Sequence, residues 1–261
     1  MSKPILLLRL EGPLQSWGVR SRWDVRDTTL EPTKSGVIGL LGCALGYPMH
    51  APELETLSDA LRFGVRVEHP GMVVTDYQTI TDYLPTAGGQ YKSRGGVKSL
   101  EAIRAAGDAP ATIISPRAYL EDAAFLVALE EREGYPDLLE RCATALQRPR
   151  WPLFLGRKAC VPTRPICEAL TNAYSGLEDA LQHHPWSWLG ARGEVRRSQP
   201  TRLEAFVEVP DGTPGLEVAL RQDRVQINPA RIYGFRTVRR IPDIAFPGVQ
   251  KGVTSCSTSP N

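Results

Sequence analysis

The 261-residue sequence predicts a protein of the α+β class, and three observations support this class. In the first part of the chain, apolar runs typical of strands alternate with segments whose apolar residues recur at helical spacing. A long polar, glycine-containing insertion interrupts this alternation at about residues 74–118. After residue 167 the composition changes to prolines, a tryptophan-rich patch and strand-like runs. We therefore expect one larger domain that contains the insertion, followed by a smaller β-rich part.

The larger domain, residues 1–167, begins with an apolar run typical of a strand at residues 5–11. The apolar content then favours a glycine-rich helix at residues 35–45 and a second helix after Pro52. Residues 63–68 alternate between apolar and polar side chains as a strand does. This half of the domain therefore follows the order strand, helix, helix, strand.

The second half of the domain follows the insertion. A buried type of strand is expected at residues 123–129, an amphipathic helix at 138–146 and a further strand at 152–156. Without the insertion and the extra helix, the order is strand, helix, strand, strand, helix, strand. That order is the one of a ferredoxin-like, split βαβ domain.

The smaller β-rich part occupies residues 168–250. Its candidate strands lie near residues 203–209, 216–221 and 231–239. We expect the tail, residues 251–261, to be disordered, because it is short, polar and terminal.

Composition and motifs exclude several function classes. The formal net charge is only +2, so a surface for an anionic partner must come from the placement of charge. No apolar run is long enough for a membrane span, and the N-terminus lacks the features of a signal peptide. The five cysteines are scattered without metal-ligand spacing, which indicates free thiols in the reducing cytoplasm. We expect no cofactor, no metal and no membrane partner.

The insertion has a composition that suits single-stranded nucleic acid, because bases stack on aromatic rings and cations follow phosphates. It contains three tyrosines and two glycine pairs, and three cations lie in a stretch without acidic residues between Asp82 and Glu101: Tyr77, Tyr83, Tyr91, Gly88–Gly89, Gly95–Gly96, Lys92, Arg94 and Lys98. The alternative is a solvated, poorly ordered hairpin. A long insertion in a compact domain is functional or disordered in most proteins.

Two tracts without acidic residues contain several arginines. They lie between Glu140 and Glu168 and between Asp223 and Asp243. Guanidinium groups make forked contacts with phosphates and stack on bases. Although one such tract is more often a solvated face, their combination with the insertion favours a nucleic-acid partner.

The helix at residues 35–45 presents glycines on one side. Gly36, Gly39 and Gly42 recur every third residue, which lets another backbone or a ligand approach closely. Ser35 is the expected N-cap, and the free amides behind it, with Lys34 beside them, form a candidate phosphate site. Tight packing of the helix on a sheet explains the same glycines equally well.

Three blocks of the sequence resemble the CasD family, which supplies a subunit of type I-E CRISPR Cascade complexes. The blocks are RLEGPLQSWG at residues 9–18, EPTKSGVIGLLGCALG at 31–46 and FLGRKACVPTRPI at 154–166. They occur in the order expected for the family, whereas the C-terminal third matches only loosely.

The resemblance implies a non-catalytic, RNA-binding protein with an RRM-like domain and a thumb-like hairpin inserted at about residues 74–118. Members of the family hold the 5′ handle of the guide RNA (crRNA) in the cytoplasm. They contact the backbone filament and the large subunits of the complex, and target DNA only indirectly. The RNA-binding residues expected on this basis are Trp17, Arg20, Arg22, Lys34, Ser35, Gly36, Gly39, Tyr91, Lys92, Arg94, Arg157 and Lys158.

Two other function classes stay open at this point. Some relatives in other CRISPR subtypes are thought to cut repeat RNA without a metal ion, which requires a general base, most often histidine. The histidines of this chain, at positions 50, 69, 183 and 184, lie outside the three blocks. A scaffold that contacts only proteins is the third class. It predicts no retention of RNA at moderate salt.

Overall fold

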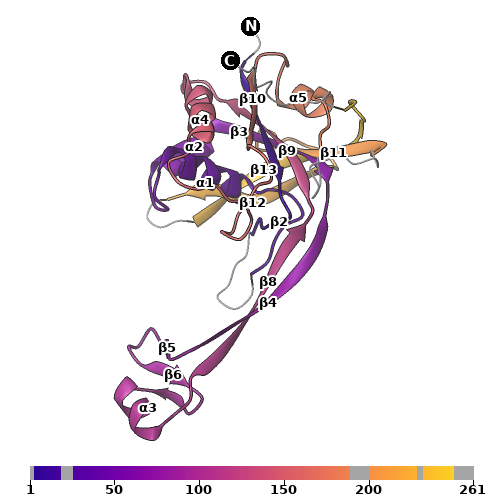
Figure 1. Cartoon of the computed structure of the whole chain (residues 1–261). Helices are drawn as coiled ribbons and strands as arrows, with labels where there is room; N and C mark the ends of the chain where they lie inside the picture. Colours follow the sequence, from indigo (N-terminus) through magenta and orange to yellow (C-terminus); the bar gives the residue numbers. More distant parts are fainter. Residues whose placement is uncertain (1–2, 19–25, 189–199, 228–231, 250–261) are drawn as a thin grey trace, which may run out of the picture.

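The computed structural model describes residues 3–18, 26–188, 200–227 and 232–249. The protein is a mixed α/β body with antiparallel sheets and five helices in these residues, and a long hairpin projects from the body (Figure 1). None of the described helices is long and apolar enough to cross a membrane. The predicted site residues Arg20 and Arg22 and the predicted tail, residues 251–261, lie outside the described residues.

The body is built on one seven-stranded sheet with the strand order β10-β1-β9-β3-β11-β13-β12, in which all neighbours are antiparallel. The strands are β1 (Ile5–Glu11), β3 (Leu61–His69), β9 (Ala124–Glu131), β10 (Cys167–Thr171), β11 (Arg202–Glu208), β12 (Val218–Gln226) and β13 (Ile232–Ala245). The sheet is continuous across residue 167, because β10 pairs with β1 at one edge while β11 pairs with β3.

Helices cover both faces of the sheet. On one face α1 (Lys34–Leu45), α2 (Glu53–Ala60) and α4 (Leu138–Gln147) pack over alternate β1 residues such as Leu6 and Leu8. On the other face α5 (Leu177–His183) packs over Ile5 and Leu7. Because both faces are covered, β1 is buried along its whole length and its sequence shows no alternation.

Charged side chains hold the segment after α5 against the sheet. Arg66 and Glu68 of β3 are buried and ion-paired, and Arg9 of β1 lies 3.0 Å from the same Glu68 carboxylate. The Arg66 guanidinium donates to the carbonyl oxygens of Leu181 and His184 at 2.7 and 2.8 Å. These contacts satisfy buried backbone groups that would otherwise destabilise the fold.

The insertion is the projecting hairpin, which we call the arm (residues 72–121). Its strands β4 (Met72–Asp82) and β8 (Ala111–Glu121) pair residue for residue without a break in register. The tip carries a small sheet and one helix: β5 (Leu84–Pro85), β6 (Tyr91–Ser93), β7 (Gly96–Lys98) and α3 (Leu100–Ala106). At the root, β2 (Leu14–Gln15) pairs with β8.

The clearest difference from the expected elements lies near residues 152–171. Residues 152–156 form no strand; the segment turns instead, and the Leu155 amide donates to the Cys160 carbonyl oxygen at 2.8 Å. The strand that completes this part of the sheet is β10, an edge strand without apolar alternation. The apolar run at 152–156 reflects burial of Leu155 in the core, not strand formation.

Candidate RNA-binding groove

A groove of about 570 Å³ runs along the glycine-bearing side of α1. Gly36 and Gly39 lie along it, and it is open to solvent. Aromatic and apolar side chains from four other segments line it, together with two arginines: Trp17, Tyr47, Met49, Trp151, Phe154, Tyr233, Arg26 and Arg157. The groove therefore brings together parts of all three sequence blocks.

The glycines of α1 have different surroundings. A Cβ atom built on Gly36 would lie 2.8 Å from Cε3 of Trp17, and one built on Gly42 would collide with Leu54. A Cβ atom on Gly39 would meet no atom within 4 Å. Gly36 and Gly42 therefore permit close packing, whereas Gly39 leaves space in the groove.

The N-terminus of α1 is already occupied by protein groups. Thr33 is the N-cap, and its side chain accepts a hydrogen bond from the Gly36 amide, so the expected cap at Ser35 is wrong. The Asp223 carboxylate of β12 accepts from the Lys34 amide at 2.7 Å and is held by Arg236. A carboxylate thus takes the place at which a phosphate was expected.

Lys34 and Ser35 are both buried, which corrects their expected role as exposed RNA contacts. The Lys34 ammonium group is 2% exposed and lies 2.8 Å from the Glu208 carboxylate, so it takes part in an internal ion pair. Burial lowers the pKa of this ammonium group, and the Glu208 carboxylate opposes the shift. In this position Lys34 fixes α1 to β11.

Trp17 is also part of the core, at 1% exposure, although it is one of the residues that line the groove. Its indole Nε1 donates to Gln15 Oε1 at 3.0 Å, and its ring packs against Gly36. The burial of its ring in the core does not fit the expected role of Trp17 as an RNA contact. The Trp17 ring forms part of the packed wall of the groove.

Arg157 is a tie between segments. Its guanidinium donates to the carbonyl oxygens of Ala118, Arg26 and Asp27 at 2.9, 3.1 and 3.2 Å, and lies 4.6 Å from the centre of the Tyr119 ring. It therefore fixes the root of the arm to the loop before α1. The neighbouring Lys158 is exposed, as an RNA contact must be.

The tip residues of the expected site lie apart from the groove. Tyr91 is half-buried, and Lys92 and Arg94 are exposed, at the far end of the arm (Figure 1). The structure does not bring them together with Gly36 and Gly39. Any RNA that contacts both must extend along the arm.

The structure adds residues that the sequence did not single out. Trp151 is 40% exposed, and its position on the groove is fixed because its amide and that of Arg150 donate to carbonyl oxygens at the end of α1. Phe154 and Tyr233 line the same groove. A signal was present for Trp151 and Phe154, because both lie in the first arginine tract.

The four histidines are all described, and none lines the groove. His184 is buried with Nδ1 2.9 Å from the Tyr174 hydroxyl, and His69 stacks on Trp188. Within the described ranges, no group of three or more histidine, cysteine or acidic side chains could hold a metal ion.

The overall fold of this chain is similar to the folds of two CRISPR proteins of known structure. The structure aligns with a chain of a "CRISPR RNA-guided surveillance complex" (TM-score 0.66, 27% identity, 92% of this chain and 90% of that chain). It also aligns with a "Crystal structure of Cas protein" (TM-score 0.61, 33% identity, 95% of this chain and 98% of that chain).

Sequence comparison gives the family. The family model described as "CRISPR-associated protein (Cas_Cas5)" matches residues 5–239, so the chain belongs to the Cas5 family. The chain is 32% identical over 185 residues to the CRISPR system Cascade subunit CasD of Escherichia coli (strain K12), which covers 69% of this chain and 77% of the relative. The resemblance to the CasD family is confirmed.

Proposed function

We propose that this chain is a non-catalytic RNA-binding subunit of a type I-E CRISPR surveillance complex, in which it holds the 5′ handle of the guide RNA. The observation that carries the proposal is the groove along α1, in a chain whose relative is a Cascade subunit. The groove offers the aromatic faces on which unpaired bases stack.

The body provides the framework for this role. We propose that β1, α1, β3, β9, α4 and β10 form its ferredoxin-like, RRM-like core. The strand order β10-β1-β9-β3 with antiparallel neighbours supports this assignment, because it matches the order 4-1-3-2 of a split βαβ unit. The sheet face opposite α1 is covered by α5, so RNA must bind beside the helices instead of on the open sheet.

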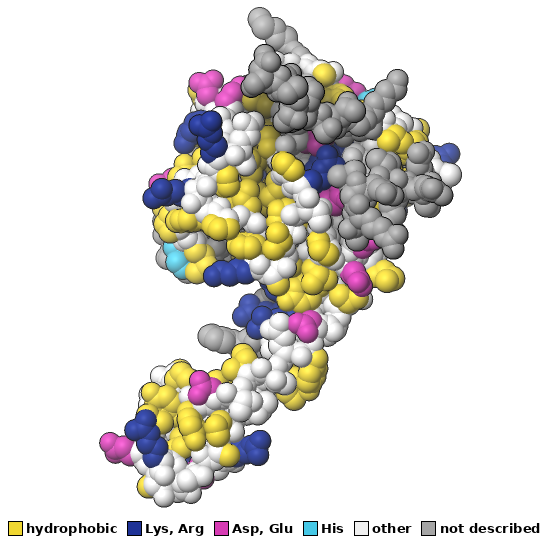
Figure 2. Space-filling view, viewed as in Figure 1, with side chains coloured by type: hydrophobic (Ala, Val, Ile, Leu, Met, Phe, Trp, Pro, Cys, Tyr) yellow, Lys and Arg dark blue, Asp and Glu magenta, His cyan; other side chains and the backbone are white. Residues whose placement is uncertain are grey.

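The arm is the proposed contact with the backbone filament and other subunits. Its apolar side chains are exposed along both strands, and Figure 2 shows hydrophobic side chains at the arm's surface. Exposed apolar side chains gathered on one projecting hairpin favour an interaction site. These side chains are Met72, Val73, Tyr77, Ile80 and Ile114.

Free thiols at Cys43, Cys142, Cys160 and Cys167 support a cytoplasmic location.

The alternative, a metal-independent endoribonuclease, is not favoured. Such an enzyme needs a general base within reach of the bound strand. His184 and His69 are engaged by Tyr174 and Trp188, and neither His50 nor His183 is among the residues that line the groove, although His50 follows the lining residue Met49. The arrangement supports binding without strand cleavage.

The proposal is tested by binding of repeat-derived RNA to the full chain in EDTA. We expect the RNA to be retained intact, and Trp151→Ala to weaken binding by about 5- to 150-fold, because a base–aromatic stack contributes about 1–3 kcal/mol. Tyr135→Ala is the matched control, because Tyr135 is similarly exposed but lies outside the groove. Specific cleavage of the RNA would favour the enzyme. Equal affinities of both variants would contradict the proposed groove.

A further inference from the structure

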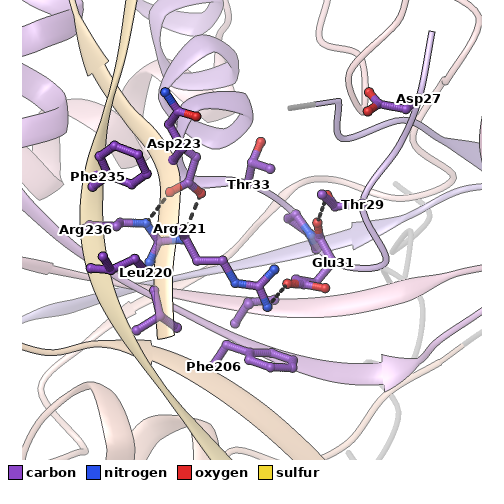
Figure 3. A pocket seen from close by; sticks show the side chains of 14 residues that line it. Asp27, Thr29, Glu31, Thr33, Phe206, Leu220, Arg221, Asp223, Phe235 and Arg236 are labelled. Atoms are coloured by element: carbon purple, nitrogen blue, oxygen red, sulfur yellow. Dashed lines mark hydrogen bonds and ion pairs between the residues drawn. The ribbon is translucent and has the colours of Figure 1, made fainter. Parts of the chain in front are cut away.

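A second pocket lies on the face of the sheet that α1 covers, and Figure 3 shows it from close by. Its volume is about 400 Å³, within the range of about 300–1,000 Å³ that small-molecule sites occupy. Val65, Phe206 and Val238 line it from three adjacent strands. The loop before α1 and part of β12 line its sides. Thr33 lines both the pocket and the groove, so the two are adjacent.

The pocket contains a carboxylate and a guanidinium side by side. Glu31 Oε1 lies 2.6 Å from Nη2 of Arg221, and the Arg221 guanidinium carbon lies 5.5 Å from the centre of the Phe206 ring. Figure 3 shows both charged groups reaching toward each other near Phe206. The Glu31 side chain is mostly buried, and burial raises the pKa of its carboxyl group.

The loop that carries Glu31 is fastened to the groove. The Thr29 hydroxyl lies at hydrogen-bond distance from the carbonyl oxygens of both Trp17 and Glu31, at 2.6 and 2.7 Å, and the Thr29 amide donates to Trp17. The other ion pair of the pocket, Arg236–Asp223, differs from Glu31–Arg221. Both Asp223 oxygens already accept hydrogen bonds from Arg236 or the Lys34 amide. Glu31 contacts Arg221 through one oxygen, Oε1. Glu31 and Arg221 are therefore the pair that we expect to contact a ligand.

We infer that this pocket receives one unstacked base of the bound RNA and selects guanine through Glu31 and Arg221. The inference rests on the proposed function. Proteins read single-stranded RNA by stacking splayed bases on aromatic or guanidinium planes and by hydrogen bonding to their Watson–Crick edges. Phe206 supplies an aromatic plane, Arg221 supplies a guanidinium plane, and Glu31 supplies a hydrogen-bond acceptor, all within one cavity.

The donor and acceptor pattern decides between the bases. A carboxylate accepts hydrogen bonds, and guanine presents two adjacent donors, N1–H and the N2 amino group, with the O6 acceptor beside them for Arg221. Cytosine offers one amino donor to the carboxylate. Uracil flanks its single N–H with two carbonyl oxygens, which the Glu31 carboxylate repels. The pocket therefore ranks guanine first and uracil last.

The test measures the affinity of the full chain for repeat-derived RNAs in which each nucleotide is replaced in turn. We expect one position at which guanine binds about tenfold or more tightly than uracil, since a good bidentate contact discriminates by about 1–3 kcal/mol. Inosine at that position, which lacks the amino group, gives an intermediate affinity. In Glu31→Gln the preference is lost, because guanine-containing RNA binds more weakly and uracil-containing RNA, no longer repelled by a carboxylate, binds at least as tightly as it does to the wild type.

Glu178→Gln is the matched control, because Glu178 also pairs with an arginine, Arg239, but comes from α5 on the other face of the sheet. It keeps the preference. If Glu31→Gln lowers the melting temperature strongly, Arg221→Gln, whose side chain is more exposed, gives the decisive measurement and loses the preference likewise. A guanine preference that persists in the folded variants overturns the inference, as does wild-type binding without any preference. Absence of RNA binding by the wild type instead overturns the proposed function.

Discussion

The glycines on one side of α1 differ in what they allow. The spacing of Gly36, Gly39 and Gly42 in the sequence is regular, but only the structure separates packing from access. Trp17 and Leu54 occupy the space next to Gly36 and Gly42, whereas Gly39 faces open space in the groove. Of these regularly spaced glycines, Gly36 and Gly42 therefore have a packing role, and Gly39 is the candidate for contact with a ligand.

Leucine substitutions separate these roles. Gly39→Leu is expected to lower RNA affinity by about tenfold or more while the melting temperature stays equal or rises, because leucine is a better helix former by roughly 1 kcal/mol. Gly36→Leu is expected to lower the melting temperature, because its Cβ would press on Trp17. Thermal unfolding and fluorescence anisotropy of labelled RNA measure both. Unchanged RNA affinity of a folded Gly39→Leu variant would remove the groove from the binding site.

The buried residues at the start of α1 show where prediction from sequence ends. Lys34 looks like a phosphate contact in its local sequence, yet its partners are Glu208 and Asp223. These acids follow Lys34 by 174 and 189 residues. No local pattern contains such a pairing, because only the antiparallel arrangement of β11, β13 and β12 brings the acids to α1.

At the scale of elements, local periodicity predicted the helices α1, α2 and α4 and the strands β1, β3 and β9 to within a few residues. The C-terminal strands β11, β12 and β13 were also found, with less accurate ends. Elements without strong apolar patterns were missed. The edge strand β10 is half-buried throughout, and α5 is short. The insertion was recognised from the length and composition of its segment, its thumb-like hairpin was expected from the resemblance to the CasD family, and its regular pairing was not predicted.

Removal of the arm tip tests the role of the arm. Asp82 and Ala111 are directly paired at the outer end of β4 and β8, so an Asn-Gly turn can connect them in place of residues 83–110. We expect an unchanged melting temperature of the body, because β4 is exposed along most of its length and its pairing partner is β8. We expect weaker incorporation into the complex, because the exposed side chains of the tip such as Val97 are removed while those of β4 and β8 remain.

Co-expression with the other subunits and size-exclusion chromatography measure this effect. Binding of short RNA to the isolated shortened chain serves as the control, because the groove on the body is unchanged. Full incorporation of the shortened chain would show that the tip makes no contact that incorporation requires.

At the scale of the whole molecule, the structure neutralises many of the cations that the sequence displays. In the second arginine tract, Arg224, Arg236, Arg239 and Arg240 pair with Asp59, Asp223, Glu178 and Glu204. Ion pairs of this kind leave less charge for RNA. The cations available near the groove come mainly from the first tract, which includes the exposed Lys158.

The salt dependence of RNA binding measures which cations contact phosphates. The slope of log Kd against log salt changes by about 0.7 for each phosphate contact that a single strand loses, between about 50 and 200 mM salt. Lys158→Gln is expected to reduce the slope by this amount. Arg240→Gln is the control, because Arg240 is paired with Glu204 and Glu217, and its slope should equal that of the wild type. Identical slopes for both variants would exclude Lys158 from the RNA contact.

The arm also has a mechanical consequence. Its paired strands span eleven residues, or about 35 Å at about 3.3 Å per residue. Rotation of such a lever by about 5° at its root moves its far end by about 3 Å, which follows from that length. Arg157 holds the root of the arm by donating hydrogen bonds to three carbonyl oxygens. The guanidinium group of Arg157, together with the pairing of β2 with β8, therefore restricts how far the tip can swing relative to the body.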